Sequence, residues 1–319
     1  MKPRLLITRK VFPEVLAALA EHFDIESNQA DEEWSAEDLG RRVADKQALF
    51  VVASDRIDAA LLAAAPDLRI VATGSVGYNH VDLAHLRGRG IPLTITPDVL
   101  TEATADMAWA LLMAAARRVC ESEHWLRAGY WKRWAFDQFL GEDVHGATLG
   151  ILGMGRIGSA IARRARGFSM KVLYSNRSPA ANEAELGATR VERDVLLRES
   201  DHLVIVVPYS AATHHLIGAA ELATMKPTAT LINIARGGIV DDVALAAALK
   251  AGTIAAAGLD VYENEPALAP ELLTVPNVVL TPHLGSATRT SRVGMAMLAA
   301  RNLIAWASGE PLPTPVPAN

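Results

Sequence analysis

The chain alternates short apolar runs with longer helical segments, and this alternation limits its fold more than any other feature. The runs at residues 49–52 and 70–72 are apolar throughout, as expected for strands that are buried on both faces. Helical patterns at about residues 57–65 and 82–89 separate such runs. Alternating strands and helices predict a parallel sheet with helices on both of its faces.

A second alternating series begins at Thr148, with strands expected at residues 148–152, 171–175, 203–207, 229–235, 255–261 and 278–281. The first series has too few strands to form a complete domain on its own. We therefore expect the last helix, at about residues 288–308, and the proline-rich tail to pack on the domain formed by the first series.

The 319 residues suggest about two domains. We expect an α/β protein with two Rossmann-like or flavodoxin-like parallel-sheet domains and a deep interdomain cleft. The substrate-binding domain would comprise residues 1–99 and 286–319, and the dinucleotide-binding domain residues 100–285.

One segment between the two series is unusual in composition. A helix is expected at about residues 102–120, and Trp125, Trp131 and Trp134 follow it closely. These tryptophans could cap a core. They could also belong to an arm, at about residues 121–146, that packs on a second subunit, because interfaces favour tryptophan. The residues alone leave both interpretations open.

Charge and hydropathy exclude several classes of protein. Lys and Arg total 31 against 36 Asp and Glu, so no broad surface for nucleic acid is expected. Mean hydropathy is +0.17, yet no apolar stretch reaches the ~18 residues of a spanning helix, so no membrane partner is expected. The only cysteine is Cys120, and no secretory signal is visible, which favours a reducing, cytoplasmic location.

The strand at residues 148–152 leads into Gly153-Met154-Gly155-Arg156-Ile157-Gly158, and a helical pattern follows at once. Gly153 permits the tight turn, Gly155 lets the backbone approach a pyrophosphate, and Gly158 lets helix and strand pack closely. Free N–H groups at the helix start then bind phosphate oxygens. This context predicts a dinucleotide site.

The end of the next strand favours NADP(H), with NAD(H) as the alternative. NAD sites usually carry an acidic residue there that accepts a hydrogen bond from the ribose 2′-hydroxyl, but this chain has Ser175-Asn176-Arg177-Ser178. Hydroxyls, an amide and a guanidinium can bind a 2′-phosphate. The other interpretation is an ordinary surface turn, since Pro179 follows.

Three ionisable side chains follow three predicted strands of the second series. They are Arg236, Glu265 and His283. The carboxyl ends of strands in an open α/β sheet form the ligand crevice. Reduction of a 2-oxo acid needs an anion site, a proton donor and a group that orients the donor. Each of the three residues alone is more often a solvated loop residue, but together they form a candidate site for such chemistry. No metal site is expected, because the adjacent His214 and His215 lack a metal-binding spacing.

The chain resembles the D-isomer-specific 2-hydroxyacid dehydrogenases over nearly its whole length. The resemblance rests on Gly74-Ser75-Val76-Gly77-Tyr78-Asn79-His80-Val81-Asp82, the Gly153 motif, and residues 233–238, 258–266 and 281–283. Within the family the chain is most similar to bacterial glyoxylate/hydroxypyruvate reductases, a branch that includes 2-ketogluconate reductases. The non-acidic turn at residues 175–178 fits that NADPH-preferring branch.

The resemblance implies a role for each catalytic residue. Arg236 would bind the substrate carboxylate and keto oxygen, and His283 would donate the proton to that oxygen. Glu265 would hydrogen-bond His283 and favour its protonated form. Backbone N–H groups of Val76 and Gly77 would complete the carboxylate site.

The resemblance also implies a cofactor site and a homodimer. Trp134 would reach into the partner's active site. Asp260 would lie near the nicotinamide amide, and the cleft would close on substrate through hinges near residues 98–101 and 284–287. The expected cofactor-binding residues are Gly153, Gly155, Arg156, Ile157, Gly158, Ser175, Asn176, Arg177, Ser178, Pro208, Thr213, Ala235, Asp260, His283, Gly285 and Thr104. His80 replaces a residue that is usually Asn in this family, and the sequence gives it no role.

We therefore expect NAD(P)H-dependent reduction of a short 2-oxo acid, such as glyoxylate or hydroxypyruvate, to the D-2-hydroxy acid. The alternatives are reduction of 2-ketogluconate or another 2-oxo acid, a phosphoglycerate dehydrogenase and a corepressor-like protein that senses the dinucleotide. A phosphoglycerate dehydrogenase usually carries the acid that is missing after residue 174. A formate dehydrogenase is disfavoured, because such relatives carry Gln in place of Glu265.

Overall fold

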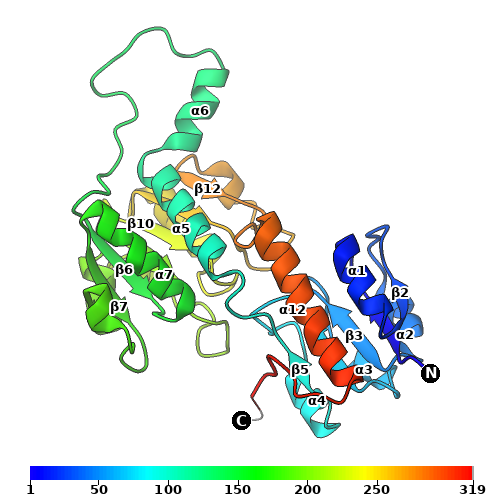
Figure 1. The fold of residues 1–319 in the computed structure, drawn as a ribbon. Helices are drawn as coiled ribbons and strands as arrows, with labels where there is room; N and C mark the ends of the chain where they lie inside the picture. Colours follow the sequence, from blue (N-terminus) through cyan, green and yellow to red (C-terminus); the bar gives the residue numbers. More distant parts are fainter. Residues whose placement is uncertain (318–319) are drawn as a thin grey trace. The chain divides into compact units, whose positions relative to one another are not determined.

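The computed structural model describes residues 1–317 and divides into two compact units. Unit 1 contains Met1–Leu100 and the chain from Ala287 onward, and unit 2 contains Thr101–Ser286. Each unit is built on one parallel sheet flanked by helices (Figure 1). The predicted fold class, two α/β units with parallel sheets, is confirmed.

The sheet of unit 1 has five strands in the order β2-β1-β3-β4-β5, all paired in parallel. The strands are β1 (Arg4–Ile7), β2 (Asp24–Ser27), β3 (Ala48–Val51), β4 (Ile70–Thr73) and β5 (Leu93–Thr94). The helices are α1 (Pro13–Ala20), α2 (Ala36–Val43), α3 (Ala59–Ala63), α4 (Leu83–Gly88) and α12 (Arg289–Ala307).

The strands of this sheet are apolar throughout because both of its faces are covered. Leu5 and Ile7 pack into the cluster that contains Val15 of α1 and Leu303 of α12. Leu6, between them, packs into the cluster on the other face, with residues of α3 and α4. Successive residues of a strand point to opposite faces, so each face receives its own set of apolar side chains.

The C-terminal segment is fixed to unit 1 through the buried Asn302 of α12. The Asn302 amide donates to Thr314 Oγ1 at 2.8 Å and accepts from the Thr314 N–H at 3.0 Å. The Thr314 hydroxyl donates to the Ile95 carbonyl, and the Val316 N–H donates to the Leu93 carbonyl. This segment therefore extends the hydrogen bonding at the β5 edge of the sheet.

The sheet of unit 2 has seven parallel strands in the order β12-β11-β10-β9-β6-β7-β8. The strands are β6 (Thr148–Leu152), β7 (Lys171–Ser175), β8 (Ala188–Arg190), β9 (His202–Ile205), β10 (Thr230–Asn233), β11 (Ala256–Leu259) and β12 (Val278–Leu280). The helices are α5 (Thr101–Ala116), α6 (Val119–Arg127), α7 (Arg156–Ala165), α8 (Glu183–Leu186), α9 (Arg193–Glu199), α10 (Ala219–Leu222) and α11 (Asp242–Ala251), with 3₁₀ turns η1 (Arg166–Phe168) and η2 (Leu272–Thr274).

The expected single helix over residues 102–120 is wrong, because the structure breaks it into α5 and α6. Arg118, between them, has φ of 53°, a left-handed conformation that ends one helix and redirects the chain. Its guanidinium makes two hydrogen bonds of 2.8 Å to the Glu121 carboxylate. Helix α6 and the loop after it extend away from the sheet of unit 2 (Figure 1).

No helix within residues 1–317 combines the length and the apolar character that a bilayer-spanning segment needs.

Replacement of Asn302 by Ala should lower the free energy of unfolding by about 1–3 kcal/mol, because the partly buried N–H and hydroxyl groups of Thr314 then lose their hydrogen bonds to the Asn302 amide. Urea denaturation followed by circular dichroism measures this change. The neighbouring exposed Arg301→Ala is the control and should change it by less than about 0.5 kcal/mol. Equal stability of the two variants would show that Asn302 does not fix the tail.

Candidate active site

The three ionisable residues singled out by the sequence lie beyond neighbouring strands of unit 2. Arg236 follows β10, Glu265 follows β11 and His283 follows β12. The order β12-β11-β10 makes these strands adjacent, and their parallel pairing places their carboxyl ends at one edge of the sheet. The fold thus brings together residues that lie 47 positions apart (283 − 236) in the sequence.

Glu265 and His283 form a direct pair. His283 Nδ1 lies 2.7 Å from Glu265 Oε2. The other carboxylate oxygen, Oε1, accepts a 2.9 Å hydrogen bond from the Tyr262 N–H. An ionised carboxylate only accepts, so this geometry assigns a proton to Nδ1 and leaves Nε2 as the nitrogen that does not face Glu265.

Opposing effects act on the charges of this pair and of Arg236. Burial raises the pKa of Glu265, but hydrogen bonds from His283 and the Tyr262 N–H, with the charges of His283 and Arg236, outweigh it and leave the pKa below its usual value. Burial lowers the pKa of Arg236, and the negative charge of Glu265 opposes that change. Glu265 therefore stays ionised beside His283 and Arg236, and the three side chains form one cluster of ionisable groups.

The loop that carries His283 is tied to the buried Asp260. The Asp260 carboxylate accepts from the Thr281 hydroxyl and from the N–H groups of Leu284 and Gly285, each at 2.6 Å. The Asp260 carbonyl accepts from the His283 N–H at 3.0 Å. Asp260 thus accepts four hydrogen bonds that together fix residues 281–285.

His283 itself has φ of 52°, in the left-handed region that side-chain-bearing residues rarely adopt. Such a conformation costs of order 1–3 kcal/mol and persists only where the surroundings impose it. The bonds from Asp260 supply that constraint. A backbone held in this way at a reactive side chain is typical of functional sites.

The glycine-rich loop has the form expected for a dinucleotide site. Gly153 has φ of 108°, and a Cβ built at Gly155 would meet nothing within 4 Å. A Cβ at Gly158 would collide with the Gly153 carbonyl, so this glycine is needed for close packing. Helix α7 begins at Arg156, directly after Gly155, and Ile157 and Gly158 lie in its first turn. These residues fit a pyrophosphate that contacts the loop and the start of α7.

The turn after β7 carries Asn176, Arg177 and Ser178 beyond the strand's last residue, Ser175. The Asn176 side chain is directed to the glycine loop, since its Oδ1 accepts from the Met154 N–H at 2.7 Å. Arg177 and Ser178 are exposed. Asn176 thus braces the glycine loop, and Arg177 is the cationic side chain that the turn presents to solvent.

Arg190, which the sequence reasoning missed, holds this turn from the neighbouring strand β8. Its guanidinium donates to the Asn176 carbonyl at 2.9 Å and to the Arg177 carbonyl at 3.1 Å. The only signal was the pairing of β7 with β8, which joins Tyr174 to Arg190. That pairing could not be predicted while the three-residue strand β8 was itself unassigned.

The remaining predicted cofactor residues lie at the same strand ends or beside them. Pro208 and Thr213 close the loop after β9, where the Thr213 hydroxyl donates to the Pro208 carbonyl at 3.0 Å. The Ala235 N–H donates to Asn233 Oδ1 in the turn that precedes Arg236. A Cβ built at Gly285 would meet Asp260 Oδ2 at 3.2 Å and Thr104 at 3.4 Å, so these three residues lie together.

The predicted carboxylate loop belongs to unit 1 and is stabilised there by side-chain hydrogen bonds. Thr73 Oγ1 lies 2.8 Å from Ser75 Oγ and 3.1 Å from His80 Nε2. The Ser75 hydroxyl donates to the Gly77 carbonyl at 2.7 Å. This network fixes the backbone around Val76 and Gly77, and it gives His80 a structural contact that the sequence did not predict.

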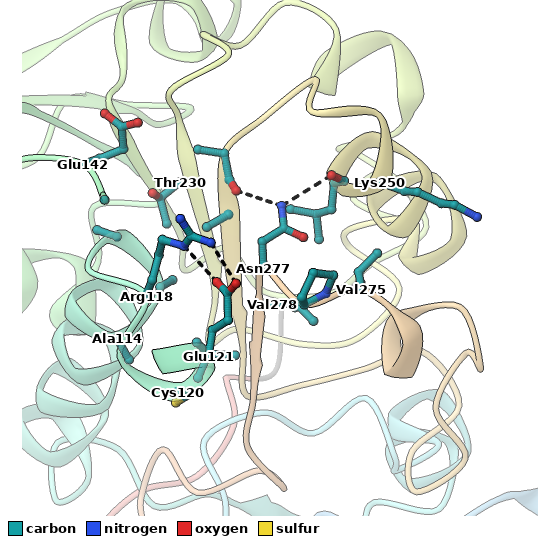
Figure 2. Close-up of a pocket in the computed structure, with 18 of the residues that line it drawn as sticks. Ala114, Arg118, Cys120, Glu121, Glu142, Thr230, Lys250, Val275, Asn277 and Val278 are labelled. Atoms are coloured by element: carbon teal, nitrogen blue, oxygen red, sulfur yellow. Dashed lines mark hydrogen bonds and ion pairs between the residues drawn. The ribbon is translucent and has the colours of Figure 1, made fainter. Parts of the chain in front are cut away.

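A cavity of about 610 Å³ in unit 2 lies at the opposite edge of the sheet, where β10, β11 and β12 begin (Figure 2). Thr230, Asn277 and Val278 line it, together with Arg118 and Glu121 from the junction of α5 and α6. The Asn277 amide donates to the Ala255 carbonyl at 2.8 Å. None of the predicted catalytic or cofactor residues lines this cavity, which is therefore separate from the candidate active site.

Trp134 lies in the loop after α6, and its surroundings are exposed. It is 66% exposed and stacks edge-on against Phe136, which is 89% exposed. In the isolated chain, therefore, not all tryptophans of this segment cover a hydrophobic core.

Comparison with known proteins identifies the family of the chain. Residues 109–285 match the family model described as "D-isomer specific 2-hydroxyacid dehydrogenase, NAD binding domain". Glyoxylate reductases of Thermococcus onnurineus and Aeropyrum pernix are 51% and 48% identical to the chain. They cover 98% and 97% of it, and the matches span 96% and 94% of those relatives.

Solved structures agree over nearly the whole chain. A D-isomer specific 2-hydroxyacid dehydrogenase from Polaromonas sp. has a TM-score of 0.92 at 37% identity, covering 99% of this chain and 100% of that one. An NADPH-dependent glyoxylate/hydroxypyruvate reductase from Sinorhizobium meliloti, in complex with NADP and malonate, has a TM-score of 0.89 at 39% identity. That match covers 100% of this chain and 98% of the other. The resemblance deduced from the sequence is confirmed, and the chain belongs to the D-isomer specific 2-hydroxyacid dehydrogenase family of oxidoreductases.

Proposed function

We propose that the chain is an NADPH-preferring reductase of short 2-oxo acids, with glyoxylate and hydroxypyruvate as substrates. The observation that carries this proposal is the His283–Glu265 pair beside Arg236 at the carboxyl ends of β10, β11 and β12. Relatives named glyoxylate reductase, about 50% identical over nearly the whole chain, support the substrate class.

Bound NADPH would supply the hydride to C2 of the substrate. The glycine loop, the start of α7 and the turn at residues 175–178 would hold that cofactor, because their open backbone and exposed Arg177 suit phosphates. Each remaining step depends on the chain's own residues.

Arg236 would bind the substrate carboxylate and polarise the keto oxygen, since a guanidinium matches a carboxylate in shape and charge. His283 would donate a proton from Nε2 to the keto oxygen as that oxygen gains negative charge. Glu265, bonded to Nδ1, would orient the ring and favour its charged form before transfer. Val76 and Gly77 of unit 1 would offer their N–H groups to the carboxylate.

A substrate panel tests the assignment. Loss of NADPH absorbance should be fastest with glyoxylate or hydroxypyruvate, slower with 2-ketogluconate and phenylpyruvate, and slower with NADH than with NADPH. Hydroxypyruvate should give D-glycerate. L-Glycerate as the product, or no oxidation with any of the four acids, would contradict the proposal; the second result, together with intact NADPH binding, would favour a dinucleotide-sensing protein.

Arg177→Ala should raise the KM for NADPH by about 10- to 100-fold and change the KM for NADH less than about twofold. The lost interaction is a charged hydrogen bond to the 2′-phosphate, worth about 1.5–3 kcal/mol. Steady-state kinetics with both cofactors measure it, with the exposed Arg198→Ala of α9 as the matched control. An unchanged KM for NADPH would refute the proposed 2′-phosphate contact.

Asp260→Asn should lower kcat by about 10- to 100-fold and change NADPH affinity less, because it disturbs the loop that positions His283. An amide cannot accept from all three donors that the carboxylate now satisfies. Rapid-mixing kinetics and NADPH fluorescence titration separate the two effects. Asp194→Asn, at an exposed position of α9, is the control. A normal kcat in Asp260→Asn would remove Asp260 from this positioning role.

We also propose that the chain is a homodimer that uses the segment after α6 as its arm. Tyr130, Trp131, Trp134 and Phe136 are more than half exposed, which is unusual for so many neighbouring aromatic residues. Sedimentation should give about twice the 34.1 kDa chain mass, and replacement of Trp131 and Phe136 by Ser should yield monomers. Leu273→Ser, exposed elsewhere on unit 2, should stay dimeric. A monomeric parent at micromolar concentration would contradict this proposal.

A further inference from the structure

Unit 2 contains a second cluster of ionisable side chains beyond the catalytic candidates. His214 and His215 lie in the loop between β9 and α10, and Glu263 lies in the loop after β11. One ligand atom from each residue lies within 4.8 Å of the other two. The fold thus brings two imidazoles and a carboxylate together, although His215 and Glu263 lie 48 residues apart in the sequence.

One contact in this cluster is close to the ligand spacing of a metal site. His215 Nε2 lies 3.0 Å from Glu263 Oε2. Bonds of about 2.0–2.1 Å to a tetrahedral ion place neighbouring ligand atoms about 3.3 Å apart. The His214 and His215 rings stack with centroids 4.0 Å apart, so a modest rotation of His214 would bring its nitrogen to the same ion.

Partners around the cluster orient the rings. The Tyr209 hydroxyl lies 3.2 Å from His214 Nδ1, and Asp241 Oδ2 lies 3.8 Å from His215 Nδ1. Histidines that bind metals commonly use their other nitrogen for a hydrogen bond to an oxygen, and the Tyr209 contact is of this kind, whereas Asp241 lies at ion-pair distance from His215. Asp241 also caps α11, and therefore its position is fixed.

Hydrogen bonds hold the backbone of His215 and Glu263 in place. The His215 N–H donates to the Gly238 carbonyl at 2.7 Å, and the Ile217 N–H donates to the Ile239 carbonyl at 3.1 Å. The Glu263 N–H is held by the Asp242 carboxylate at 3.0 Å. His215 has φ of 47°, the left-handed region in which a residue other than glycine is uncommon. The backbone positions of His215 and Glu263 are thus set before any ion arrives, and only the His214 ring has to adjust, which reduces the ordering that binding requires.

We propose that His214, His215 and Glu263 bind one divalent transition-metal ion of the Zn²⁺ class, with water completing the coordination. Two imidazoles with one carboxylate suit Zn²⁺, Co²⁺ or Ni²⁺ rather than Mg²⁺ or Ca²⁺, which prefer oxygen ligands alone. The sequence predicted no metal site because the histidines lack a metal-binding spacing along the chain. The third ligand comes from a distant loop, which spacing cannot reveal.

This site is distinct from the catalytic candidates, although the loops are shared. Glu263 lies two residues before Glu265, and the Gly238 carbonyl that holds His215 lies two residues after Arg236. An ion here would join the loop after β9 to the loop after β11. Binding would therefore restrain both loops and raise the thermal stability of the protein, independently of the reaction the enzyme performs.

Titration of the chelator-treated, full-length protein tests the proposal. Isothermal calorimetry with Zn²⁺ should show one site per chain, and Co²⁺ should give visible absorption bands that Zn²⁺ abolishes. Zn²⁺ should raise the melting temperature, and Mg²⁺ should not. His215→Gly, His214→Ala and Glu263→Gln should each weaken Zn²⁺ binding at least tenfold. Glycine is chosen at His215 because it tolerates the left-handed backbone.

His124→Ala is the matched control, because His124 also lies beside a glutamate, with 4.0 Å between His124 Nε2 and Glu123 Oε2, but has no second histidine next to it. It should bind Zn²⁺ as the parent does. His283→Gln should also retain the site, which separates it from the His283–Glu265 pair. Binding within twofold of the parent in any of the three cluster variants, loss of the site in His283→Gln, or no binding of Zn²⁺ below millimolar concentration would overturn the proposal.

Discussion

The parallel pairing of β9, β10, β11 and β12 is the constraint on which the candidate active site depends. Parallel strands present all of their carboxyl ends at one edge, so the loops after them must lie side by side. Arg236, Glu265 and His283 each follow one of these strands. The glycine-rich loop follows β6, which pairs with β9 in the same sheet. One topological rule thus places the glycine-rich loop and the three candidate catalytic side chains along one edge.

Within that edge, hydrogen bonds to backbone groups decide where the reactive atoms lie. Asp260 holds residues 281–285 through its carboxylate and carbonyl, and the Tyr262 N–H holds one oxygen of Glu265. These bonds impose a left-handed conformation on His283 that an isolated chain would rarely adopt. His283, the proposed proton donor, is therefore positioned by the fold before substrate arrives, which is what catalysis by preorganised groups requires.

Much of this candidate site could be predicted from the sequence, because each motif has a local physical reason for its residues and spacing. Gly153, Gly155 and Gly158 have the conformations or packing that the motif predicts. The parts that were missed are short or polar. Strand β2 contains Asp24 and Glu26, and β5 has only two residues, so neither shows an apolar run.

Other features depend on contacts between distant segments. The break at Arg118 was missed because the residues on both sides favour a helix, and the left-handed φ is visible only in the structure. Arg190 reaches the Arg177 turn only through the pairing of β7 with β8. The grouping of Glu263 with His214 and His215 likewise requires the fold of two loops. Local pattern predicts the elements well, whereas long-range placement of polar side chains needs the structure.

A double-mutant cycle on kcat/KM for glyoxylate reduction tests most directly whether His283 and Glu265 act as one catalytic pair. The variants are His283→Gln, Glu265→Gln and the double replacement, measured with saturating NADPH. If Glu265 acts through His283, the double variant should be no slower than His283→Gln alone, within about twofold. Losses that simply multiply would show that the two residues contribute independently, which would contradict the account given by the geometry.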